Sequence, residues 1–238
     1  MIRHNGRALD SMRSVAIERD YIKNTNGSVL VKFGDTQVIC TATVETRVPP
    51  WLAGSGKGWV TAEYAMLPGS ASGGRISRNA NQKGRALEIS RLIGRSLRAV
   101  IDLKALGEVQ ITVDCDVIQA DGGTRTASIT GGYVALCIAV ENIIKEMGLP
   151  ASPITNQCAA ISVGMLQGHG HLDLDYVEDS SADVDLNLVM TSDSSIIEVQ
   201  GTAEGESFNR SELNTMLDLG EKGINELFAL QKSVLNHG

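Results

Sequence analysis

Hydrophobic positions follow two different periods along the chain, and these periods predict an ordered series of strands and helices. Apolar and β-branched residues recur at every second position in several short runs, which is the period of a strand with one buried face. Two such runs flank the turn pair Gly34-Asp35 and predict a hairpin of residues 28–33 and 36–44. Further strands are predicted near residues 59–61 and at 109–113, 159–163, 172–177, 184–189 and 196–199, after a polar lead-in at residues 7–19.

Helical periodicity is found in three longer stretches. Residues 85–101 carry one apolar stripe, residues 129–147 are mostly apolar, and a capping box at residues 209–212 opens a final helix that runs to about residue 234. Gly148-Leu149-Pro150 ends the first series of strands and helix, and the second series then begins with strands. We therefore predict one domain over residues 1–238, of the α+β or layered α/β class, with halves at approximately 1–148 and 149–238.

The segment between the strand at 109–113 and the helix at 129–147 carries the first candidate site. Asp121-Gly122-Gly123 permits a tight turn, and the residues after it deliver hydroxyls and a guanidinium to the start of the helix: Thr124, Arg125, Thr126 and Ser128. Free backbone N–H groups, hydroxyls and an arginine at a helix N-terminus form an anion site. The alternative is a plain strand-to-helix turn that Thr126 or Ser128 caps, which explains the hydroxyls but not the arginine or the glycine pair.

Composition is that of a globular protein, with 42% hydrophobic and 21% charged residues among 238. The net charge of −7 argues against a polyanionic partner until its distribution is considered. Residues 69–98 hold one acidic residue, Glu88, and seven basic ones: Arg75, Arg78, Lys83, Arg85, Arg91, Arg95 and Arg98. A basic island on an acidic body can bind a polyanion locally.

Within this island, residues 69–84 lack periodicity and predict a mobile basic loop. Arg85 opens the following helix directly behind Lys83-Gly84, where an anion is favoured. Further along that helix Arg91, Arg95 and Arg98 are interpreted as a solvated face with ion pairs, which subunit contacts would also use.

A second candidate site is the acidic segment 178–187. On a strand, Asp183, Asp185 and Asn187 would share one face, and Asp179 would approach from the preceding turn. Carboxylates held so close raise each other's pKa or require a cation, and such oxygen ligands suit Mg²⁺. The alternative is an acidic surface strand with ordinary turn aspartates.

The cysteines, the N-terminus and the apolar runs indicate the cellular environment of the protein. Cys40, Cys115, Cys137 and Cys158 are far apart and show no CxxC spacing, so we expect neither a metal centre nor a disulfide framework. The N-terminus has no apolar signal region, and no apolar run suggests a membrane span. A reduced cytoplasmic protein is expected.

The motif Cys-Asp-Val-Ile-Gln-Ala-Asp-Gly-Gly-Thr-Arg-Thr-Ala at residues 115–127 closely resembles the signature of the ribonuclease PH family. Further blocks similar to that family follow its order, at residues 58–64, 102–108, 176–180 and 198–205. The resemblance extends from about Arg7 to the last helix. It implies a ribonuclease PH-like domain built from two βαβα-type halves.

The resemblance also implies an activity. Family members are phosphate-dependent 3′→5′ exoribonucleases that trim the 3′ trailing nucleotides of tRNA precursors, release nucleoside diphosphates and add nucleotides in reverse. It assigns phosphate binding to Arg85, Gly123, Thr124 and Arg125, with Thr126 or Ser128 as further candidates. It assigns the metal and catalytic roles to Asp179 and Asp185, with Mg²⁺ as cofactor and inorganic phosphate as co-substrate.

For RNA, the resemblance implies a homohexameric ring, a trimer of dimers, with Arg75, Arg78 and Lys83 of the basic loop facing the substrate. This chain departs from the family there, because it lacks the expected Thr-x-Thr-Arg element after Leu67-Pro68. Two alternatives belong to other classes: a non-catalytic ring subunit of an exosome-like assembly, and a nucleotide-binding enzyme unrelated to RNA. The first would be marked by loss of the acidic pair or the arginines, which this chain keeps.

Overall fold

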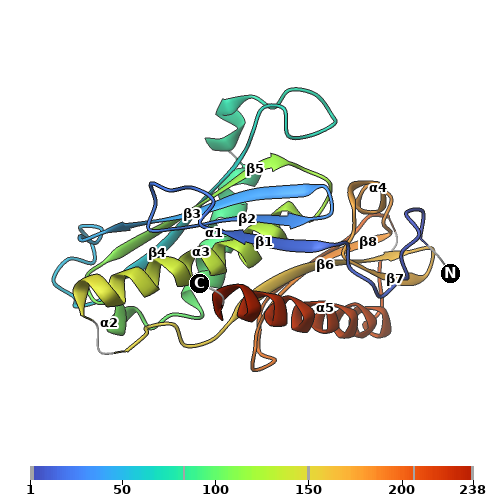
Figure 1. Ribbon diagram of the computed structural model, residues 1–238. Coiled ribbons are helices and arrows are strands. Elements are labelled where there is room, and N and C mark those ends of the chain that lie inside the picture. The colour runs from blue at the N-terminus through green and yellow to red at the C-terminus, as the bar shows by residue number, and fades with distance from the viewer. Residues whose placement is uncertain (1–2, 83, 149–150, 206, 237–238) are drawn as a thin grey trace.

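A computed structural model of the protein describes residues 3–82, 84–148, 151–205 and 207–236, which form two β-sheets with helices packed on them (Figure 1). In chain order the elements are β1 (Val15–Arg19), β2 (Gly27–Phe33), β3 (Thr36–Glu45), β4 (Trp59–Met66), the 3₁₀ helix η1 (Arg78–Gln82), α1 (Arg85–Arg98), α2 (Leu103–Leu106), β5 (Gln110–Gln119), α3 (Thr124–Met147), β6 (Cys158–Leu166), β7 (His169–Leu172), α4 (Tyr176–Asp179), β8 (Val184–Thr191), β9 (Ile196–Ala203) and α5 (Arg210–Asn236). The predicted mixed α/β class is confirmed.

The first sheet has the strand order β1-β2-β3-β5-β4. Its strands alternate as predicted: in β3, for example, Val38, Cys40 and Ala42 are fully buried between half-buried neighbours. The buried face packs against α1 and α3, whereas the other face carries polar residues. β4 and β5 are parallel, so β5 reaches the carboxyl edge of the sheet beside β4 and delivers the chain to the start of α3 there.

The second sheet is antiparallel, in the order β7-β6-β8-β9. Helix α5 covers β6 and β7, and its start is the predicted capping box, in which the Asn209 side chain accepts the backbone N–H of Glu212 while the Glu212 carboxylate accepts that of Asn209. Helix α3 contacts strands of both sheets, so one core runs through the two halves. Figure 1 shows the two sheets side by side, with the N-terminal segment next to β7.

Helix α3 corrects one expectation. The segment Thr124–Glu146 is long and apolar enough to cross a membrane, contrary to the expectation from the sequence, but 83% of its most apolar 18-residue stretch is buried inside the protein. A helix that is hydrophobic on all sides is typical of a core surrounded by other elements. The apolarity of α3 is therefore explained by its position between two sheets.

Several elements also differ from prediction. β1 forms an edge strand where a polar lead-in was expected, and α3 begins at Thr124 rather than at residue 129. The strand predicted over 172–177 is wrong: β7 ends at Leu172, and α4 follows. Asp175 caps α4, because its carboxylate accepts the Glu178 N–H while Glu178 accepts the Asp175 N–H. The alternating apolar residues Leu172 and Leu174 imitate a strand but lead into this capped turn.

Candidate functional site

The turn from β5 into α3 is built as the glycine pair predicts. Gly122 and Gly123 both adopt positive φ, at 73° and 66°, a conformation that residues with a side chain seldom take. Gly123 is the N-cap of α3, and among the described residues no side chain caps the first N–H groups of the helix. The N-terminus of α3 thus has the free donors and positive dipole end that bind anions.

The capping alternative for Thr126 and Ser128 is wrong. Both side chains are buried, and their hydroxyls donate to backbone carbonyl oxygens, Thr126 to Gly123 at 2.9 Å and Ser128 to Thr124 at 2.8 Å. Neither residue lines the adjacent cavity, so the structure adds no support to the suggestion that one of them binds phosphate. Their hydroxyls are used within the helix itself.

A cavity of about 490 Å³ lies at the start of α3. Its wall includes the main predicted phosphate-binding residues and the two predicted catalytic residues: Arg85, Gly123, Thr124, Arg125, Asp179 and Asp185. It also includes Gly122 and Asn187 of the two predicted candidate sites, and further residues that the sequence did not point to: Met66, Ala71, Ser72, Gly73, Ile76, Ala120, Ser162, Tyr176 and Glu204. The two halves of the chain therefore contribute to one site, of a size that suits a small ligand.

Two arginines mark the cationic side of this cavity. The Arg125 guanidinium donates to the side-chain oxygen of Gln200 in β9 and lies 3.7 Å from the Glu88 carboxylate of α1. Gln200 in turn donates to Glu88 at 3.0 Å, so the three side chains tie α1, α3 and β9 together. Arg85 is exposed at the first position of α1, whose N-cap, Gly84, also provides no side-chain cap. Two guanidiniums and two uncapped helix N-termini thus meet at the cavity.

Tyr64 of β4 fixes the orientation of Thr124. The two hydroxyl oxygens are 2.8 Å apart, and Tyr64 is almost fully buried. Burial raises the pKa of the Tyr64 phenol, and this outweighs the hydrogen bond to Thr124, which acts in the opposite direction. Tyr64 therefore stays neutral and serves as a hydrogen-bonding partner. Tyr64 lies in the segment 58–64 that resembles the family, but the sequence pattern predicted no role for it.

Asp179 and Asp185 form the acidic side. Asp179 is the last residue of α4, and Asp185 lies in β8 beside Asn187, where both alternate with buried Val184 and Leu186 as predicted. Asp183 was expected on the same face but lies before the strand. Its carboxylate accepts the backbone N–H of Gln167 at 2.9 Å, and it does not line the cavity. Asp183 is therefore not part of the cavity wall, unlike Asp185 and Asn187.

The two cavity carboxyls have pKa values above the ordinary range. Burial within the site raises the pKa of Asp179, and the neighbouring Asp185 carboxylate raises it further, while Arg85 and Arg125 only partly offset this. Burial likewise raises the pKa of Asp185, against the lowering effect of Arg125. Two mutually repelling carboxylates with only oxygen donors suit Mg²⁺, which binds few protein ligands plus water and phosphate oxygens.

These pKa shifts predict that the charged Asp179 and Asp185 carboxylates lower the stability of the folded protein at neutral pH. Because the folded-state pKa of Asp179 is raised, ionisation is harder in the folded protein, and stability falls as the pH rises from the ordinary carboxyl value through the raised one. Asp179→Asn should therefore raise Tm by a few degrees at pH 7, with the gain shrinking toward about pH 4. Thermal unfolding across this range checks it. Asp183→Asn, outside the cavity, should give no such gain, and a lower Tm for Asp179→Asn at pH 7 would contradict the assignment.

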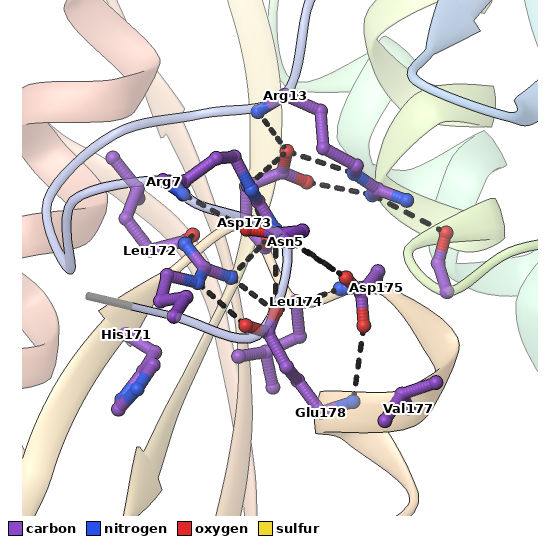
Figure 2. A network of polar contacts seen from close by, with 12 residues as sticks. Asn5, Arg7, Arg13, His171, Leu172, Asp173, Leu174, Asp175, Val177 and Glu178 are labelled. Carbon is purple, nitrogen blue, oxygen red and sulfur yellow. Dashed lines mark hydrogen bonds and ion pairs between the residues drawn. The ribbon is translucent and has the colours of Figure 1, made fainter.

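A second cluster of ligand-type atoms lies outside the cavity. Among the residues that the structure describes, His4, Asp175 and Glu178 could approach one metal ion by distance. Their carboxylates already have donors, however: Glu178 accepts from Arg3 and Arg7, and Asp175 accepts from Asn5 and contacts His4 at 2.9 Å. Figure 2 shows Asn5, Arg7, Asp175 and Glu178 together. The cluster is an ion-pair network of the N-terminal segment, which the sequence reading missed.

The basic island is spread over several environments. Residues 67–82 project from the body beyond β5 (Figure 1), and Arg75 and Arg78 are exposed there without lining the cavity. Lys83, also predicted to bind RNA, lies outside the described residues. On α1, Arg91 is exposed, Arg95 pairs with Glu198 at 2.7 Å, and Arg98 lies 4.4 Å from the Trp59 ring. The predicted ion-paired face of α1 is thus present at Arg95.

All four cysteines are buried free thiols. They take no part in the cavity wall.

Several solved structures are similar to this one. Rice (Oryza sativa) Rrp46 matches with a TM-score of 0.79 and 18% sequence identity, over 98% of this chain and 100% of that one. A chain of the Archaeoglobus fulgidus exosome with RNA bound to the active site matches with a TM-score of 0.78 and 20% identity, over 98% and 92%. A chain of an archaeal exosome core gives 0.73 and 20%, over 98% and 91%. At these identities the similarity shows a shared fold.

The sequence itself matches two models of one family. Domain 1 of the 3′ exoribonuclease family matches residues 11–140, and domain 2 matches residues 156–223. The first match alone spans more than half of the chain and contains the glycine turn, Arg85 and Arg125; the second contains Asp179 and Asp185. The resemblance to ribonuclease PH is confirmed, and the protein belongs to the 3′ exoribonuclease family.

Proposed function

We propose that the protein is a phosphate-dependent 3′→5′ exoribonuclease that releases nucleoside diphosphates from RNA. One observation carries this proposal: two arginines and two uncapped helix N-termini meet two carboxylates with raised pKa values in the wall of one cavity. A cationic subsite beside an acidic one is what transfer of a phosphoryl group to an anionic acceptor requires.

The cationic side would bind inorganic phosphate. Arg85 and Arg125 offer fork-shaped pairs of donors that match a tetrahedral anion, and the N–H groups at Gly123 and Thr124 add uncharged donors. Gln200 and Glu88 hold the Arg125 guanidinium in place, so phosphate meets a preorganised partner. A phosphate oxygen then attacks the phosphorus of the last phosphodiester, and the bond from phosphorus to the 3′ oxygen of the preceding nucleotide breaks.

The two aspartates on the acidic side would assist departure of the 3′ oxygen. Asp185 lies in the cavity wall, and burial raises its pKa, so it is the candidate to give a proton to the departing 3′ oxygen. Asp179 and Asp185 are also the residues that would hold Mg²⁺, whose positive charge, when bound, stabilises the charge on the phosphate oxygens. Nearly equal bond energies on the two sides make the exchange reversible, so nucleotide addition from nucleoside diphosphates is expected as well.

The RNA would enter as a free 3′ end, with tRNA precursors as the substrate class. The cavity has an apolar part, with Met66, Ile76 and the half-exposed Tyr176, which can contact a base beside the charged groups. Arg75 and Arg78 are exposed on the projecting segment and can contact the backbone further along the strand. A homohexameric ring would bring several copies of these basic residues to one RNA and so strengthen its binding.

The second candidate is a ring subunit without catalytic activity of its own. The three solved structures described above favour it, because they are rice Rrp46 and chains of two exosome structures. If this chain is one subunit of an RNA-binding ring, its similarity to exosome subunits is explained without any catalytic activity of its own. The retained arginines and aspartates of the cavity support the catalytic proposal instead.

The purified protein separates the two candidates. A short single-stranded RNA labelled at its 5′ end is incubated with Mg²⁺, with and without inorganic phosphate, while light scattering reports the assembly state. Stepwise shortening only in the presence of phosphate supports the enzyme. An assembled ring that binds the RNA but leaves its length unchanged with phosphate would instead support the non-catalytic subunit.

A further inference from the structure

The two sides of the cavity meet at a close backbone junction. A Cβ on Gly122 would lie 2.6 Å from the carbonyl oxygen of Leu174 and 2.9 Å from the backbone nitrogen of Tyr176. The Tyr176 N–H also points at the Asp121 carboxylate, 3.3 Å away. The turn that presents the phosphate donors therefore rests directly on the segment that leads into α4 and ends at Asp179.

One side chain from a third part of the protein spans this junction. Arg13, before β1, donates to the Asp121 carbonyl oxygen and lies 3.5 Å from that of Gly122. The same guanidinium donates to both carboxylate oxygens of Asp173, at 3.0 and 2.7 Å, and the Arg13 backbone N–H donates to Asp173 at 2.8 Å. Arg13 thus binds the glycine turn with one edge and the lead-in of α4 with the other.

The N-terminal segment secures α4 in the same way. Arg3 donates to Glu178 at 2.6 Å and to the carbonyl oxygens of Leu172 and Asp173 at 2.6 and 2.9 Å. Arg7 donates to Glu178 at 3.2 Å. Figure 2 shows Arg7 and Arg13 approaching Asp173 from the same side, with Asp175 and Glu178 below it at the start of α4. Asp179 follows Glu178 directly, so its position is set by this network.

Because the Arg13–Asp173 pair is buried, it is stable only when its hydrogen bonds are well aligned. The two side chains are 7% and 1% exposed, and a buried ion pair is tolerated only when hydrogen bonds satisfy both charges. Lysine at position 13 would keep the charge but would lack the planar fork that reaches Asp173 and the two carbonyl oxygens together. None of these atoms lines the cavity itself, apart from those of Gly122.

We propose that Arg13, paired with Asp173, is a positioning residue that sets the distance between the phosphate-binding turn and Asp179. The expected effect on catalysis rests on the proposed function. The expected effect on the spacing between the turn and Asp179 rests on the contacts described above. Displacing reacting groups by about 1 Å can lower a rate by about 10²-fold. Arg13→Lys should therefore lower kcat for phosphorolysis about 10- to 100-fold, while the Kd for RNA changes less than about 3-fold.

The test compares Arg13→Lys and Arg13→Ala with Arg19→Ala in the full chain. Arg19 is a matched control, because it too is largely buried and donates to carbonyl oxygens, those of Val234 and Leu235, but away from the cavity. Tm, kcat, the KM for phosphate, and amide hydrogen exchange at residues 121–124 and 176–179 are measured for each. Arg13 variants should lose kcat and exchange faster at both segments, whereas Arg19→Ala should lose Tm only.

Two results would overturn the inference: kcat within 2-fold of the unchanged protein for Arg13→Lys, or an equal loss of kcat in Arg19→Ala. Should the unchanged protein release no nucleoside diphosphate, the proposed function fails, and hydrogen exchange alone decides the structural claim. In that case unchanged exchange at both segments in Arg13→Ala would refute it, and faster exchange at both would uphold it.

Discussion

Replacement of Arg125 by alanine is expected to abolish phosphate-dependent release of nucleoside diphosphates or to reduce it by about 10²-fold or more. Arg125 is anchored by Gln200 and Glu88 at the cavity, so its loss removes a preorganised cation that Arg85, exposed on the opposite helix start, cannot replace. RNA binding should remain largely intact, because the exposed basic residues are unchanged. The measurement is initial rate against phosphate concentration, with RNA affinity determined separately.

A matched control is available on α1. Arg91 is an exposed arginine that does not line the cavity, so Arg91→Ala changes the net charge by the same amount. It should leave the phosphate dependence unchanged. If Arg125→Ala shows the same phosphate dependence as Arg91→Ala, the cavity is not the phosphate site.

Asp185→Asn is expected to lower phosphorolysis by about 10²-fold or more at saturating phosphate, the scale for a lost acid–base group. The change keeps the side-chain shape but removes a charge and a proton source from the cavity. Asp179→Asn should behave similarly and should be partly rescued by higher Mg²⁺. Rates are compared at matched folding, as judged by Tm.

Asp183→Asn is the control for the acidic pair. It removes the same charge two residues from Asp185, but its carboxylate contacts Gln167 outside the cavity. Its rate should stay within about 3-fold of the unchanged protein, since surface substitutions are mostly mild. Near-native rates for all three variants would remove the acidic pair from the mechanism.

Local patterns in the sequence were enough to predict the parts of the site that lie within single elements. The glycine turn before α3 and the alternation of Asp185 and Asn187 with apolar residues in β8 both depend on neighbours in the chain. The family motifs then selected Arg85, Gly123, Thr124, Arg125, Asp179 and Asp185, and the structure places all of them in one cavity wall. Their chemical roles remain predictions.

The parts that sequence could not predict depend on contacts between distant segments. Arg3 and Glu178 are 175 positions apart, and no periodicity links them. Asp183 shows the same problem at short range: the alternation with Asp185 suggested a shared face, but the strand begins only at Val184, and the turn directs Asp183 toward Gln167. Tyr64 likewise gained a role only when folding brought its hydroxyl to Thr124.

The most direct test of the central claim follows the phosphorus atom itself. Radiolabelled inorganic phosphate is incubated with the purified protein, Mg²⁺ and an unlabelled short RNA, and the released nucleotides are separated. Attack by phosphate bound at Arg85 and Arg125 predicts that the label appears in the β-phosphate of nucleoside diphosphates, and that Arg125→Ala abolishes this incorporation. Release of unlabelled nucleoside monophosphates at a rate independent of phosphate would contradict the account.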